Sequence, residues 1–136
     1  MPEIKINHLA IVVENIEDSL SFWRDALGLS MGDIKEVTQE EVKIAFLDVG
    51  ESHIELVQPT TDTSGIARHL AKKGSGMHHV CLEVEDITLA LQQMSEKGIE
   101  LINETARERD GRKYAFIHPK STGGVLVELY EYLTEA

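Results

Sequence analysis

Apolar and polar positions along the first half of the chain predict one strand, one helix and three more strands. The β-rich run Ile4–Val13 predicts a strand, and the helical spacing of apolar residues in Ile16–Leu27 predicts a helix. We expect three further strands at residues 30–38, 42–49 and 53–58, because polar or glycine-containing breaks separate these runs. The first half therefore predicts the order βαβββ.

The second half of the chain repeats this order. We expect its strand, helix and three further strands, in that order, at residues 77–84, 87–97, 100–103, 113–117 and 125–132. A linker of residues 61–75 contains an extra helical stretch around Ile66–Lys73. The chain thus consists of unit one, residues 1–60, and unit two, residues 76–136, joined by this linker.

The two units are copies of one pattern. When the sequence is set against itself at an offset of 71 residues, His8 falls on His79, and at an offset of 73 residues Glu55 falls on Glu128. A unit of about 60 residues buries too little apolar surface to be stable alone. We therefore predict an α+β protein in which two tandem βαβββ units pack into one domain, residues 1–136, with a cleft between their curved sheets.

The repeat predicts a metal site in that cleft. Side chains alternate along a strand, so His8 points to one face and Leu9 to the other. The pseudo-symmetry gives His79 the placement of His8, and Glu128 that of Glu55. Two imidazoles and two carboxylates suit a divalent first-row metal that keeps open positions for water or substrate.

The remaining histidines and the cysteine are expected outside this ligand set. His53 shares the face of Glu55, but Leu126 is its counterpart in the second unit, so we expect a structural or supporting role. His69 lies in the linker helix and is expected in solvent. Cys81 is expected to be a small packed residue.

Composition and charge narrow the class of protein. With 42% hydrophobic and 27% charged residues the chain can bury a core, and its formal net charge of −11 opposes binding to nucleic acid. No apolar run approaches the roughly 20 residues that span a bilayer, and the first residues lack the pattern of a signal peptide. We expect a cytoplasmic protein that binds neither membrane nor nucleic acid.

The repeated histidines and glutamates resemble those of the vicinal oxygen chelate superfamily, which includes glyoxalase. Within it, Gly76–Val80, His118–Lys120 and Gly124–Leu129 look most like methylmalonyl-CoA epimerase. The resemblance implies interconversion of (R)- and (S)-methylmalonyl-CoA by removal of the α-proton and stabilisation of an enolate. It also implies a homodimer with one divalent ion per chain, Co²⁺ in first place and Zn²⁺, Ni²⁺ or Mn²⁺ as alternatives.

The same resemblance suggests roles for single residues. Glu128 is implied to be both a metal ligand and an acid/base. The family carries a second acid/base, a glutamate, on its third strand, and the matching position here is taken to be Lys43. An anionic CoA thioester needs local cations, and the basic segment near the C-terminus offers Lys120, Lys113 and Arg112.

Two alternatives remain open from the sequence. A glyoxalase (lactoylglutathione lyase) would use the same four ligands on a glutathione hemithioacetal, although the segments around His118–Lys120 and Gly124–Leu129 favour a CoA substrate. A non-enzymatic small-molecule-binding protein on the same fold would have little need for all four ligands.

Overall fold

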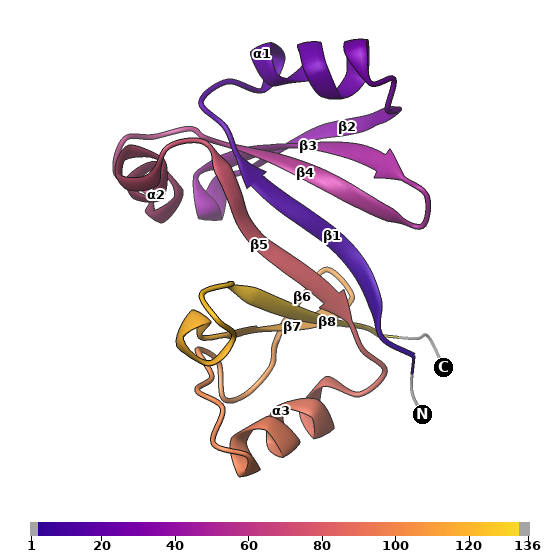
Figure 1. Cartoon of the computed structure of the whole chain (residues 1–136), viewed down its shortest axis with the longest axis vertical. Helices are drawn as coiled ribbons and strands as arrows, with labels where there is room; N and C mark the ends of the chain where they lie inside the picture. Colours follow the sequence, from indigo (N-terminus) through magenta and orange to yellow (C-terminus); the bar gives the residue numbers. More distant parts are fainter. Residues whose placement is uncertain (1–2, 134–136) are drawn as a thin grey trace. The chain divides into compact units, whose positions relative to one another are not determined.

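The computed structural model describes residues 3–133 and divides the chain into two compact units (Figure 1). The first unit is His8–His78, and the second contains Asn7 together with the described residues from His79 onward. Each unit is an α+β assembly with the order βαβββ. Among residues 3–133, no helix has the length and apolar character needed to cross a membrane. The predicted α+β class and the duplicated unit are therefore confirmed.

The first unit is a four-stranded sheet with a helical segment over one face (Figure 1). Its strand order is β2-β3-β4-β1, in which β1 is parallel to β4 and the other neighbours are antiparallel. The elements are β1 (Lys5–Val12), α1 (Ile16–Leu20), β2 (Met31–Val37), β3 (Val42–Val49), β4 (Ser52–Pro59) and α2 (Gly65–Lys73).

The helical segment of the first unit changes character after its first turns. The side chain of Asn15 accepts a hydrogen bond from the backbone N–H of Asp18 and so caps α1. Residues Ser21–Ala26 then continue as a π-helix, in which the N–H of Leu27 bonds to the carbonyl of Phe22, five residues back. The predicted helix Ile16–Leu27 is thus helical along its length, but only its first part is α-helical.

Apolar side chains bury the helix-facing side of the first sheet. Ile16 and Leu20 of α1 pack against buried residues of β3 and β4, namely Ala45, Leu47 and Leu56. The opposite face has its own small cluster around Ala10, Val42 and Val57. Both faces of β3 and β4 are therefore buried in part, and the second of them also carries the polar residues described below.

The second unit repeats this arrangement with different residues. Its strand order is β5-β8-β7-β6, with β5 parallel to β8 and the remaining pairs antiparallel. Ile87 and Leu91 of the helix pack against Ala115, Ile117 and Leu129 of the sheet. The elements are β5 (Gly76–Glu83), α3 (Ile87–Glu96), β6 (Arg107–Arg109), β7 (Arg112–Ile117) and β8 (Val127–Tyr132).

The strand predicted at residues 100–103 is wrong. Only an isolated bridge from Leu101 to Ile117 forms there, and the strand that precedes β7 is β6 (Arg107–Arg109). The side chain of Asn103 accepts the backbone N–H of Phe116, so a side chain takes the place of a strand partner.

The linker helix is confirmed as α2, which Ser64 caps by accepting the backbone N–H of Ala67. It belongs to the first unit. His69 on this helix is half-buried rather than in solvent, with its ring centroid 4.8 Å from that of His78.

Candidate functional site

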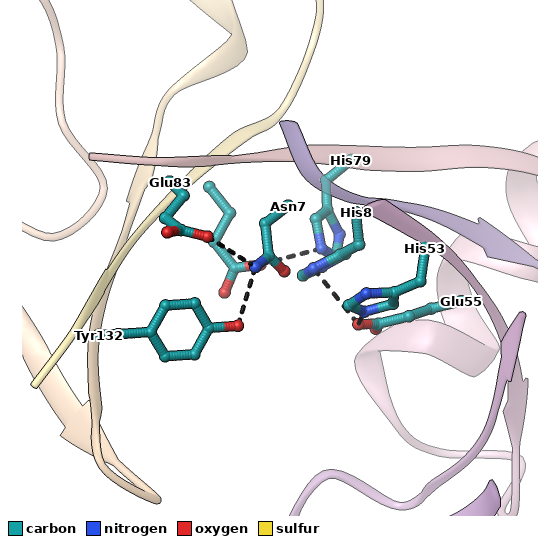
Figure 2. A network of polar contacts seen from close by, with 8 residues as sticks. Asn7, His8, His53, Glu55, His79, Glu83 and Tyr132 are labelled. Carbon is teal, nitrogen blue, oxygen red and sulfur yellow. Dashed lines mark hydrogen bonds and ion pairs between the residues drawn. The ribbon is translucent and has the colours of Figure 1, made fainter. Parts of the chain in front are cut away.

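The first unit gathers two histidines and one glutamate on one face of its sheet (Figure 2). The parallel register of β1 and β4 pairs His8 with His53 and Ala10 with Glu55, so these side chains share a face, as alternation predicts. Nδ1 of His8 lies 3.3 Å from Oε2 of Glu55, and Nε2 of His53 lies 3.0 Å from the same oxygen.

This cluster has the composition and spacing of a metal site. His8 is 1% exposed and Glu55 9%, and one donor atom from each of the three residues lies within 4.8 Å of the others. Neutral imidazole and carboxylate are the donors that divalent first-row metals take in proteins. The residues present therefore fit the group that the repeat predicts.

The second unit carries the corresponding pair. Cys81 of β5 is paired with Glu128 of β8, as Ala10 is paired with Glu55 in the first unit. Nε2 of His79 lies 3.1 Å from Oε1 of Glu128, and Glu128 is only 4% exposed. Each unit thus brings its own predicted histidine and glutamate together.

A phenylalanine stands opposite each glutamate, which the sequence reasoning missed. Phe46 is paired with Glu55 across β3 and β4, and Phe116 with Glu128 across β7 and β8. The ring of Phe116 packs edge-on to His79, with ring centroids 5.6 Å apart. The signal was present, because these phenylalanines stand 70 residues apart in the aligned third strands of the repeat.

Lys43 lies on the other face of its strand, and its expected place beside Glu55 needs correction. It is paired with Gln58, three residues on from Glu55 and therefore on the opposite side of β4. Gln58 accepts the backbone N–H of Ile16 and so belongs to the helix-facing side. The β3 residue next to Lys43 that does share the face of Glu55 is Ile44, which carries no acid/base group.

The second unit repeats this placement at Lys113. Lys113 is paired with Glu131, which accepts the backbone N–H of Ile87 at the start of α3. Lys113 therefore also lies on the helix-facing side, away from the face of Glu128.

Arg112 is the predicted cation that shares a face with Glu128. Its guanidinium carbon lies 5.3 Å from the ring centroid of Tyr130 and 5.8 Å from that of Tyr132. Its Nε is buried and makes no hydrogen bond among the described residues. Lys120, in contrast, is exposed in the short 3₁₀ turn Pro119–Ser121, so the three predicted cations do not gather at one point.

A polar network that the sequence reasoning also missed lies further along the face of Glu128 in the second unit (Figure 2). Nδ2 of Asn7 donates to the hydroxyl of Tyr132 at 2.9 Å and to Oε1 of Glu83 at 3.3 Å. Asn7 is 7% exposed, so these bonds satisfy a buried amide. Glu83 and Tyr132 have the strand parity of Cys81 and Glu128, which places polar side chains along the whole face.

Known proteins share this arrangement of sequence and fold. The chain is 37% identical over 127 residues to the mitochondrial methylmalonyl-CoA epimerase of Bos taurus, which covers 92% of this chain and 73% of that protein. A hypothetical protein of Bacillus halodurans, BH1468, has a crystal structure that matches with a TM-score of 0.91 at 37% identity, over 98% of both chains. A methylmalonyl-CoA epimerase solved in complex with methylmalonyl-CoA and NH₄⁺ matches with a TM-score of 0.81 at 26% identity, over 94% of both chains.

The family model for this fold matches residues 7–116, which include both histidines and the first glutamate of the repeat. The repeated βαβββ units and the histidine–glutamate pair in each agree with that match. The chain therefore belongs to the Glyoxalase/Bleomycin resistance protein/Dioxygenase superfamily and is similar, within it, to methylmalonyl-CoA epimerases.

Proposed function

We propose that this protein is a metal-dependent epimerase that interconverts (R)- and (S)-methylmalonyl-CoA. In this proposal His8, Glu55, His79 and Glu128 hold one divalent ion. The observation that carries it is the pair of equivalent histidine–glutamate contacts, one in each repeat, in a chain similar to methylmalonyl-CoA epimerases.

The reaction requires a proton to leave the carbon between a thioester and a carboxylate and to return on the opposite face. A bound divalent ion supplies positive charge beside the thioester oxygen, where enolate charge develops. The protein must supply the groups that orient the substrate, exclude water and carry the proton.

Glu128 is the residue that we assign to proton transfer. It is buried, it contacts His79, and Phe116 stands opposite it on the neighbouring strand. A carboxylate in such surroundings is shielded from bulk water and held in one orientation, which suits a general acid/base. We assign no proton transfer to Lys43, because its strand position turns it away from Glu55.

The anionic parts of the substrate need cations, and two are available for different parts. Arg112 lies on the face of Glu128, four residues along β7 from Phe116, or about 13 Å at the rise of a strand. We propose that its unpaired Nε–H binds a charged group remote from the reacting carbon. The exposed Lys120 is proposed to contact a CoA phosphate.

The decisive experiment supplies one methylmalonyl-CoA epimer to the metal-loaded protein and follows the stereochemistry of the product. We expect both epimers at equilibrium, with deuterium at the α-carbon when the reaction runs in heavy water. A glutathione hemithioacetal serves as the matched control substrate, since it tests the same ion with lactoylglutathione chemistry. Turnover of the hemithioacetal without epimerisation would overturn the proposal.

A further inference from the structure

We propose that His53 is a direct ligand of the divalent ion, so that the first unit supplies three donors, His8, His53 and Glu55, instead of two. This inference rests on the metal site of the proposed function and adds a residue that the repeat does not supply, because its counterpart in the second unit is Leu126.

The spacing of the three donors supports coordination. Ligands about 2.1 Å from an ion, at right angles to one another, are about 3 Å apart. The two printed separations, 3.3 Å from Nδ1 of His8 and 3.0 Å from Nε2 of His53, both end on Oε2 of Glu55. A single oxygen with two imidazole nitrogens at this distance surrounds a common point that one ion can occupy.

The ring of His53 is held in place for this role. It stacks on His8, with centroids 5.1 Å apart and planes 24° apart, and it packs on Phe46 at 5.6 Å. Its side chain is 26% exposed, against 1% for that of His8. A ring fixed on two sides loses little side-chain entropy on binding an ion, and its partial exposure leaves a route for the ion to enter.

A third imidazole changes the chemistry that the site offers. Nitrogen-rich sites favour Co²⁺, Ni²⁺ and Zn²⁺ over the oxygen-seeking Mg²⁺ and Mn²⁺. With His79 and Glu128 also bound, an octahedral ion would keep one open position, so the substrate would bind through one oxygen or displace a ligand.

Proton NMR of the full-length protein loaded with Co²⁺ tests this inference, because the rings of coordinated histidines give strongly shifted signals. We expect three sets of shifted histidine ring protons, identified by selective deuteration of histidine. His53→Gln should remove one set and weaken Co²⁺ binding more than about 100-fold, beyond the 10–100-fold cost typical of groups that only support a ligand. His69→Gln, which changes a histidine outside the cluster, should keep all three.

Two sets of signals in the unsubstituted protein, both kept in His53→Gln, would overturn the inference and leave His53 as a hydrogen-bond partner of Glu55. The count in the unsubstituted protein decides the question even if the variant fails to fold. Failure of the unsubstituted protein to bind stoichiometric Co²⁺ would instead overturn the metal site of the proposed function, so the two failures are distinguishable.

Discussion

Replacing Glu128 with glutamine separates its proposed role in proton transfer from its role as a ligand. Glutamine has nearly the same shape, so the packing around this buried position is retained. The amide oxygen can still approach a cation, but the amide cannot accept and return a proton near neutral pH. We therefore expect Glu128→Gln to hold some metal and to lose most of its turnover.

The expected size of the loss follows from the kind of group removed. A positioned general acid/base contributes about 10²–10⁴-fold to the rate, which is about 3 to 5 kcal/mol of transition-state stabilisation. The 3.1 Å contact with His79 and the low exposure of Glu128 place it in a site where bulk water does not readily replace the lost carboxylate.

The repeat provides a matched control, Glu55→Gln, which makes the same chemical change at the equivalent position of the first unit. Both variants are assayed for epimerisation with metal at about 100 times the Kd measured for each. We expect kcat to fall in Glu128→Gln and to stay near the unsubstituted value in Glu55→Gln. Near-normal turnover by metal-loaded Glu128→Gln, or an equal loss in both variants, would refute proton transfer at Glu128.

Three further predictions follow from the structure. His8→Ala and His79→Ala should each weaken Co²⁺ binding by more than about 100-fold in competition with a chelator, and unchanged affinity would remove that histidine from the ligand set. Lys120→Ala should raise KM for the CoA thioester more than it lowers kcat, and an unchanged KM at low ionic strength would argue against phosphate contact. Burial, with a smaller contribution from Lys73, lowers the pKa of His69 from 6.5, so the unfolded chain takes up this proton first as the pH falls. Stability should therefore drop below pH 6.5 more steeply than in His69→Gln, and equal slopes of Tm against pH would contradict this.

The duplicated pattern made much of the fold predictable from the sequence. Copies of one unit must form equivalent elements, so the strand, helix and strand order followed from matching hydrophobic periods in both halves. The helix caps also obey the repeat, with Asn15 and Asp86 each accepting a backbone N–H three residues on. The side-chain bond from Asn103 that replaces a strand pair has no signature in hydrophobic periodicity, and there the prediction failed.

Site residues were predictable where the repeat fixed them, but less so where a strand register decided. His8 and His79 could be placed because two offsets constrained them. Lys43 was matched through resemblance alone, and a shift of one residue along a strand moves a side chain to the other face of the sheet. His53 was set aside because it has no counterpart, although its contact with Glu55 is as close as that of His8. The repeat reveals what the units share and hides what distinguishes them.

The strand that carries each glutamate also fixes the helix of its unit, and this explains how a short unit positions its ligands. Gln58 follows Glu55 by three residues and accepts the first N–H of α1, as Glu131 follows Glu128 and accepts that of α3. Because residues three apart lie on opposite faces of a strand, docking of the helix on one face fixes the carboxylate on the other. Each unit therefore builds its own histidine–glutamate pair as it folds, and later changes such as His53 can alter one half without disturbing the other. For this reason we expect ion retention and proton transfer to respond to different substitutions.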